Sequence, residues 1–343
     1  MLIVPSLTTV ILAVSSTTAT VTPENSSRLT LAIGTAIQDS VPPPSPDETD
    51  QEIESVPGLG QETSFIPGTR LTVSASYAYL FNSSIEGGGS FSLGRFRVRG
   101  RGATALTDTL DLTYGVRYQL DSFDFSRQGS NNFFSKSPWS SVDTLQLNVA
   151  GVMTIDQRWR VFGGGVVRFG AESKADWADG IEAGGAVGFS YSFSPSLTIG
   201  GGFGVTTRLE DSLYFYPIIV ADWMIVDGLM LTTRMSTGWG DETGIELVYT
   251  IAQGWDVGVG AAYEWNRFRL NDEGPAPGGV GVLRSIPTYG FLRFNATPKA
   301  SLSVYAGVNA WGQLEALDAN GNKVADEKFR PGFLLGIQGQ ITF

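Results

Sequence analysis

Two residue types that carry much of protein chemistry are missing from this sequence: none of its 343 residues is cysteine or histidine. Without cysteine there is no disulfide, no thiolate nucleophile and no cysteine-ligated metal. Without histidine, the commonest general base and the commonest metal ligand are absent. We therefore expect neither an enzyme nor a metal or cofactor site. The lack of stray thiols also suits an oxidising compartment.

Charge and long apolar runs are also scarce. Charged residues make up 17% of the chain, below the roughly 25% of ordinary soluble domains. No apolar run approaches the roughly 20 residues that a transmembrane helix needs. Glycine is abundant, with 43 residues, and 11% of the residues are aromatic. Apolar content without long apolar runs is typical of strands whose two faces differ, as in transmembrane barrels.

Acidic residues outnumber basic ones, 34 to 23, and the net charge is −11. The excess is concentrated before residue 70, where the sequence has eight acidic residues and one basic residue, Arg28. From residue 70 onward the charges are nearly balanced. A basic surface for phosphate contacts is missing, so we expect no nucleic-acid partner.

The first 69 residues form two segments of different composition. Residues 1–20 start with an apolar stretch followed by small residues, which predicts a signal peptide. Because no Lys or Arg precedes Arg28, the signal is atypical or the true start lies upstream; a buried helix is the alternative. Residues 21–69 combine the run Val41-Pro-Pro-Pro-Ser-Pro with clustered acids, which predicts a disordered periplasmic segment.

Residues 70–343 repeat one pattern, in which apolar residues alternate with small or polar ones until a turn signal follows. In residues 110–120 every even position is apolar, whereas the odd positions include Asp111 and Arg117. Residues 181–193 and 255–265 show the same alternation. Successive side chains of a strand point to opposite faces, so each segment has one apolar and one polar face.

The connections between these segments alternate strictly between short and long. Short turns are expected near residues 106–108, 156–158, 194–196, 227–228, 252–254 and 297–299. Longer loops are expected near residues 86–89, 122–138, 172–180, 208–212, 238–243, 271–283 and 315–328. Short periplasmic turns and long external loops are typical of outer-membrane barrels. We therefore predict an all-β, antiparallel, transmembrane up-and-down β-barrel of about 14 strands, with 12 as the alternative, and both termini in the periplasm.

Aromatic residues support the same architecture, because indole rings prefer membrane interfaces. Each tryptophan falls beside an expected turn or loop, which predicts two girdles. The girdle residues would be Trp139, Trp159, Trp177, Trp223, Trp239, Trp255, Trp265 and Trp311. The last segment alternates to the end of the sequence and closes on Ile341 and the terminal Phe343.

This terminal pattern resembles the signal that the barrel-assembly machinery reads in bacterial outer-membrane proteins. Together with the alternation, it makes residues 70–343 similar to uncharacterised outer-membrane β-barrel families, and more loosely to barrels for the uptake of hydrophobic compounds. The resemblance implies a bacterial outer-membrane location, with lipid, lipopolysaccharide and the assembly machinery as partners. Barrel hydrolases of that membrane use histidine, so the resemblance also argues against an enzyme. It indicates no oligomeric state.

Four arginines, Arg95, Arg97, Arg99 and Arg101, occupy alternate positions of one expected strand. A guanidinium facing lipid at the midplane costs about 2–4 kcal/mol, so the four must face the lumen or lie above the membrane. They could form a basic ladder that attracts anions. They could instead pair with acids of the next strand, such as Asp111 and Asp121, which the balanced charge favours.

Further polar residues share the inward parity and are candidates for the lumen or its selectivity. The charged ones, beyond the ladder and Asp111, are Arg117, Arg160, Arg168, Glu182, Arg208, Glu246, Asp256, Glu264 and Arg293. Glycines at inward positions 200, 202, 204, 258 and 260 would leave space for water, ligand or long side chains, or would relieve strain in a curved sheet.

The segment Asp318–Asp326 loosely resembles a calcium loop but lacks its acid spacing, which favours a solvated hairpin loop. Two functions remain open. A passive or substrate-biased channel for small solutes is favoured by the polar inward parity and by the lack of a plug-sized domain. A structural or adhesive barrel with a closed lumen, acting through its external loops, is the alternative.

Overall fold

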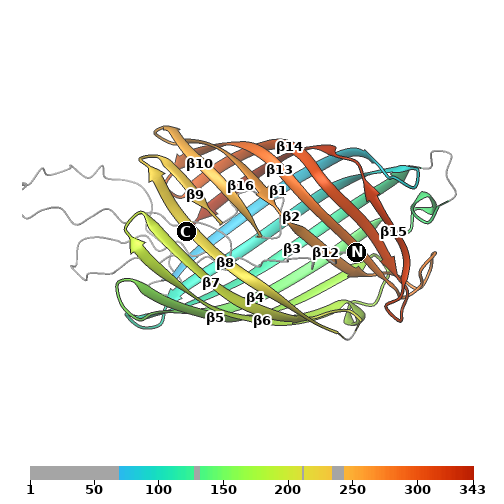
Figure 1. The fold of residues 1–343 in the computed structure, drawn as a ribbon, viewed down its shortest axis with the longest axis horizontal. Coiled ribbons are helices and arrows are strands. Elements are labelled where there is room, and N and C mark those ends of the chain that lie inside the picture. The colour runs from blue at the N-terminus through green and yellow to red at the C-terminus, as the bar shows by residue number, and fades with distance from the viewer. Residues whose placement is uncertain (1–68, 127–131, 211, 234–242) are drawn as a thin grey trace, which may run out of the picture.

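The computed structural model describes residues 69–126, 132–210, 212–233 and 243–343, which form a single closed sheet of antiparallel neighbours (Figure 1). The predicted signal peptide, most of the acidic segment and Trp239 lie outside the described residues. The first half of the sheet contains β1 (Thr69–Ser84), β2 (Ser90–Ala105), β3 (Leu110–Ser126), β4 (Ser141–Thr154), β5 (Trp159–Glu172), β6 (Ile181–Ser194), β7 (Leu197–Thr207) and β8 (Leu213–Val226). The second half contains β9 (Leu229–Thr232), β10 (Gly244–Ala252), β11 (Trp255–Ala262), β12 (Glu264–Arg269), β13 (Val280–Thr297), β14 (Ala300–Leu317), β15 (Lys323–Phe329) and β16 (Gly332–Thr342).

The sheet closes because β1 pairs with both β2 and β16. Two strands are each interrupted once: β11 continues into β12 after Tyr263, and β15 continues into β16 after Pro331, which has no N–H to donate. Counting each interrupted pair once gives fourteen strands. The predicted all-β antiparallel barrel of 14 strands is confirmed, and the alternative count of 12 is wrong.

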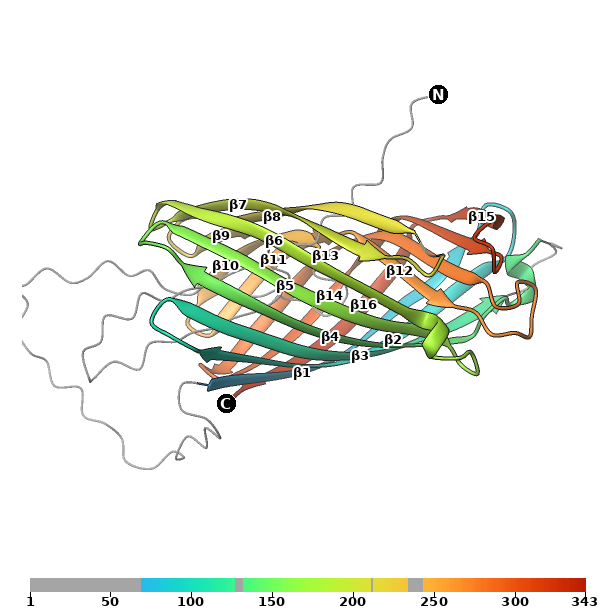
Figure 2. The same ribbon diagram turned by 90° about the horizontal axis from the view of Figure 1, so that it is seen from below.

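Short turns gather at one end of the barrel and longer loops at the other (Figure 2). We call these the turn end and the loop end. The described chain starts and ends at the turn end, where the N–H of Phe343 donates to the carbonyl of Leu71 at 2.8 Å. Short and long connections therefore alternate along the chain, as the sequence predicts.

Three loops are shorter than the sequence predicts, because the strands continue past the expected boundaries. β3 extends to Ser126, β13 begins at Val280, and β14 and β15 reach Leu317 and Lys323. These extensions pair with one another, as in the register of Leu93 with Phe123 and of Gly281 with Ala316. The paired extensions satisfy backbone groups that an irregular loop would leave to water.

The outer face of the barrel is apolar around its circumference. Half or more of the residue surface is exposed at several outward positions: 64% at Phe203, 68% at Phe215, 58% at Val259 and 50% at Phe333. Inward positions are mixed: β7 carries glycines, β8 carries the buried Ile218 and Val220, and on β2 the exposed Phe96 stands between the buried Arg95 and Arg97. This arrangement is the reverse of a soluble protein and matches the apolar band of transmembrane barrels. The only helices among the described residues are two 3₁₀ turns, η1 (Phe134–Lys136) and η2 (Ala178–Gly180), and neither is long and apolar enough to cross a membrane.

Strand β12 leaves the wall and crosses the interior. It remains paired with β13, yet its end Arg269 bridges Ala171 of β5, which lies across the barrel. At the loop end β12 thus divides the interior in two. We call the space enclosed by β12–β15 and β1–β5 the filled compartment, and the space between β12 and the inner faces of β4–β8 the hollow compartment.

The filled compartment contains the main hydrophobic core, which is built from aromatic rings. Phe123, Phe125, Phe134 and Phe268 surround Trp139, with ring centroids 5.4–6.0 Å from the indole. Trp139 is only 1% exposed. Edge-to-face pairs of this kind contribute about 0.5–1.5 kcal/mol each beyond their buried area. The predicted polar lumen is therefore wrong for this half of the loop end.

The tryptophans divide between the surface and the interior. Trp159, Trp177, Trp223 and Trp255 are exposed, and Trp311 is partly exposed. For two residues the girdle prediction is wrong: Trp139 lies in the filled compartment, and Trp265 lies on β12 inside the barrel. Proximity to a loop does not distinguish an interface ring from a ring that folds inward.

Candidate functional site

The arginine ladder begins in a buried ion-pair network beneath the aromatic core. The Nε and Nη2 atoms of Arg95 donate to the two carboxylate oxygens of Asp121 at 2.7 and 2.9 Å. Arg95 also pairs with Glu264 of β12, and all three side chains are almost fully buried. Arg95 and Asp121 are direct cross-strand partners, so the strand register creates this contact.

The remaining ladder residues find different partners. Arg97 donates to Oε1 of Gln119, its cross-strand partner, at 2.9 and 2.5 Å. Arg99 lies opposite Arg117 in the register, and Arg117 donates to Gln146 at 2.5 Å. Arg101 is partly buried and lies near the turn end.

Asp111 is not a partner of the ladder, contrary to the sequence-based expectation. It stands opposite Ala105 in the register and interacts electrostatically with Arg160 of β5. Asp111 is near Arg101 in the sequence. In the antiparallel register, however, the last arginine of the ladder lies opposite a later residue of β3, so Asp111 lies beyond the ladder.

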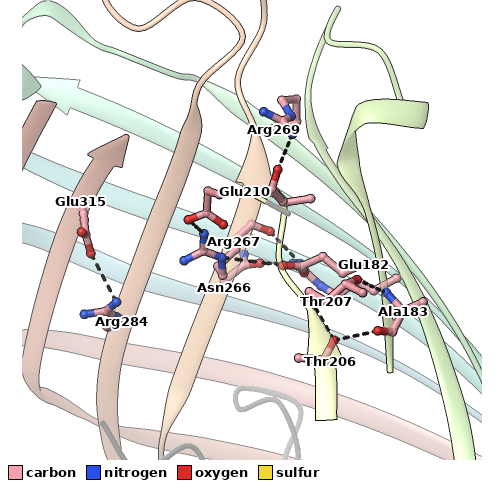
Figure 3. Close-up of polar contacts among 12 residues, drawn as sticks. Glu182, Ala183, Thr206, Thr207, Glu210, Asn266, Arg267, Arg269, Arg284 and Glu315 are labelled. Carbon is pink, nitrogen blue, oxygen red and sulfur yellow. Dashed lines mark hydrogen bonds and ion pairs between the residues drawn. The ribbon is translucent and has the colours of Figure 1, made fainter. Parts of the chain in front are cut away.

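A second network fastens β12 to the opposite wall (Figure 3). Nη1 of Arg168 donates to Oε2 of Glu182 at 2.8 Å and to the carbonyl of Arg267 at 2.7 Å, and its Nη2 reaches Asn266. Arg267 pairs in turn with Glu210 of the β7–β8 loop. Asn266 donates to Asp121 at 3.0 Å and so joins the two networks.

A third set of polar contacts lies on β10, β11 and β13, apart from the contacts made by β12. Tyr289 donates to Glu246 at 2.8 Å, and Asn295 donates to Asp256 at 2.9 Å. Arg293 lies 3.8 Å from the Asp256 carboxylate. The structure thus distributes the predicted lumen charges over several groups, two of which Asn266 joins, rather than over one selectivity ring.

The hollow compartment contains a cavity of about 200 Å³. Its wall combines aromatic rings with four arginines and a single carboxylate, that of Glu182. The aromatic and charged lining residues are Arg117, Arg168, Glu182, Arg208, Tyr214, Tyr216, Tyr263, Trp265 and Arg267. A second cavity of about 530 Å³, which we call the vestibule, lies at the loop end and is bounded by Asp179, Arg208, Glu210, Arg269 and Asn320. Arg208 lines both cavities.

Sequence reasoning did not find Tyr214, Tyr216 and Arg267. A signal for β12 was present, since Trp265, Arg267 and Arg269 share one face of the strand. Two arginines on the face of Trp265 are incompatible with lipid contact. That pattern could have placed Trp265 inside the barrel.

The inward glycines have a packing role that the structure identifies. A Cβ on Gly204 would lie 2.2 Å from the ring of Tyr216, and one on Gly258 would lie 2.4 Å from the ring of Phe291. Each ring belongs to the neighbouring strand and lies over the glycine. These positions therefore hold aromatic side chains, rather than the open space that one interpretation of the sequence expected.

The calcium-like segment forms a self-contained turn at the loop end. The carboxylate of Asp318 accepts from the backbone N–H groups of Asn320 and Asn322 and from the Asn322 amide, at 2.9–3.1 Å. The hydrogen bonds from Asn322 and Asn320 lower the pKa of the Asp318 carboxyl. Within the described residues no cluster of three or more acidic side chains is arranged to hold a metal ion.

The chain was compared with protein-family models, curated proteins and solved structures. No protein-family model matches the sequence, and no curated protein matches it significantly. Among solved structures, the chain is similar to an outer membrane channel from Pseudomonas putida F1, with 9% identity, a TM-score of 0.44, and coverage of 83% of this chain and 100% of that one. It is also similar to a FadL homologue of Pseudomonas aeruginosa, with 10% identity, a TM-score of 0.42 and coverage of 81% and 91%. The toluene transporter TodX of P. putida gives 7% identity, a TM-score of 0.41 and coverage of 81% and 91%.

Proposed function

We propose that this protein is an outer-membrane β-barrel channel for small solutes, with its loop end outside and both termini in the periplasm. The apolar outer face requires a lipid environment, because exposed patches of this extent are not tolerated in water. Within that membrane, the outward-facing Ile341 and Phe343 of the last strand would serve the assembly machinery.

The observation that carries the channel proposal is that Arg208 lines both cavities. The vestibule is polar and lies at the loop end, and the inner cavity lies below it beside β12. A solute that enters the vestibule therefore meets the inner cavity without having to displace the aromatic core. The path that we propose follows the hollow compartment, not the barrel axis.

Single-channel recording in a planar bilayer tests this proposal. Because the chain has no cysteine, a thiol introduced at Thr206, on the cavity wall, can be modified selectively. We expect discrete current steps from the wild type and a reduced step size after Thr206→Cys reacts with a charged methanethiosulfonate reagent. Ala316→Cys, buried in the filled compartment, is the matched control and is expected to show no change.

If protein that circular dichroism shows to be folded conducts no current, the channel proposal is overturned. The alternative is then a closed barrel that acts through its loops. The aromatic core and the Arg95 network favour that alternative, because together they fill half of the loop end.

A further inference from the structure

An unusual group of side chains gathers around Trp265, where the vestibule meets the inner cavity. The guanidinium carbons of Arg208, Arg267 and Arg284 lie 5.0, 5.5 and 5.4 Å from the centroid of its ring. Tyr214 meets the same indole edge to face, with ring centroids 4.6 Å apart. Three positive charges thus converge on one aromatic side chain inside the barrel.

The acids near this group already have partners. Glu182 accepts from Arg168, and Glu210 pairs with Arg267. Glu315 pairs with Arg284 at 3.3 Å and with Lys323 at 3.5 Å. Each of these three carboxylates therefore already has a cationic partner.

Arg208 has no such partner. Among the described residues its side chain makes no ion pair and no hydrogen bond, and its guanidinium rests on the ring of Tyr214 at 4.5 Å. The Nε atoms of Arg208, Arg267 and Arg284 and the Nε1 atom of Trp265 are buried without an acceptor. Buried donors without acceptors cost free energy, so a ligand oxygen that reached them would be stabilised. The Oε2 atoms of Glu210 and Glu315 are also buried without a hydrogen bond.

The cavity beside Arg208 has the size and lining for the rest of a ligand. Its volume of about 200 Å³ has room for one ring or a short chain, and Tyr216, Ala150 and Ala186 supply apolar wall. Small-molecule sites commonly combine such walls with a few well-placed polar groups. At the mouth, Arg269 donates to the backbone carbonyls of Asp179, Leu209 and Gly278 at 2.8–2.9 Å.

We propose that this cavity binds a small organic carboxylate, with the carboxylate on Arg208 and the hydrocarbon part against Tyr214 and Tyr216. A guanidinium presents two parallel donors that match the two oxygens of a carboxylate. The proposal rests on the proposed function in one respect, since the vestibule is the way into the site. It adds to that function a preference for anionic over neutral solutes of the same shape.

Equilibrium binding of benzoate to the full chain, refolded in detergent micelles, tests the site. Benzamide is the neutral control of the same shape. We expect benzoate to bind at least tenfold more tightly than benzamide, and Arg208→Gln to remove this preference. The matched control Arg158→Gln alters an exposed arginine in a turn at the far end and is expected to retain the preference.

Equal affinities for benzoate and benzamide, or an unchanged preference in Arg208→Gln, would overturn the proposal. If Arg208→Gln does not fold, the wild type still decides the matter: salt must weaken benzoate binding and leave benzamide binding unaffected. Binding needs no transport, so the two proposals can fail separately. A barrel that conducts no current but prefers benzoate would overturn the channel proposal and support the binding site. A conducting barrel without the preference would support the channel and overturn the binding site.

Discussion

The two compartments at the loop end are built from the same kind of wall but have opposite interiors. Inward positions of β2 and β3 carry Phe91, Phe123 and Phe125, and these rings pack into a dry core. Inward positions of β5 to β7 carry Gly164, Ala186 and other small residues, and a cavity remains. A barrel of fourteen strands is wide enough to hold either arrangement. In this barrel side-chain volume, and not strand number, decides whether the space behind the wall is packed or hollow.

Strand β12 makes the difference possible, because it separates the two spaces. Its Glu264 and Asn266 belong to the buried networks, Phe268 belongs to the aromatic core, and Trp265 and Arg267 line the cavity. One strand thus presents a different chemistry to each compartment. Changes on its two faces should therefore have separable effects.

The largest effect is expected from emptying part of the filled compartment. Phe268→Ala removes a fully buried ring that contacts Phe123 and Trp139. We expect the free energy of unfolding to fall by about 3–5 kcal/mol, the usual range for a buried phenylalanine. Guanidinium titration followed by tryptophan fluorescence measures this loss. The control Phe203→Ala removes an outward ring; an equal loss there would mean that the core is not packed as described.

A smaller effect is expected from overfilling the hollow compartment. Gly204→Ala places a methyl group where the ring of Tyr216 now lies, so the ring must shift toward the cavity. Overpacking of this kind costs about 1–3 kcal/mol, and we also expect a lower single-channel conductance. Gly339→Ala is the matched control, because no atom lies within 4 Å of its added methyl group. Conductance equal in the two variants would count against a path along Tyr216.

The smallest effect concerns the turn at Asp318, which joins β14 to β15 and whose Asn320 borders the vestibule. The pKa of the Asp318 carboxyl is lowered in the folded protein. Its carboxylate therefore stabilises the turn fully above the unfolded pKa of about 3.9, and this stabilisation is lost as pH falls through the folded pKa. We expect the amide protons of Asn320 and Asn322 to lose protection from hydrogen exchange below about pH 4. Asp318→Asn keeps the side-chain acceptor but does not titrate. Its protection should not change with pH, and a parallel loss there would assign the effect to another group.

Much of the architecture could be predicted because it depends on local alternation. The residues at even positions of 110–120 point outward on β3, and Arg117 and Gln119 point inward. The pairing of Arg95 with Asp121 was also within reach, since a hairpin of known turn position fixes its register. The crossing of β12 was only partly within reach. Arg267 and Arg269 on the face of Trp265 indicate that this face avoids lipid, but the contact of Arg269 with Ala171 of β5 joins residues far apart in the chain, which no local pattern shows.

The antiparallel barrel, the order of its turns and loops, and the apolar face of each strand follow from local sequence, because a strand's two faces follow from a period of two residues. What the barrel contains depends instead on how distant strands pack. Whether an inward ring closes a core, as Trp139 does, or borders a cavity, as Tyr216 does, depends on side chains from strands far apart in the chain. The crossing of β12 brings those strands together, and close packing then fixes which space is filled and which remains.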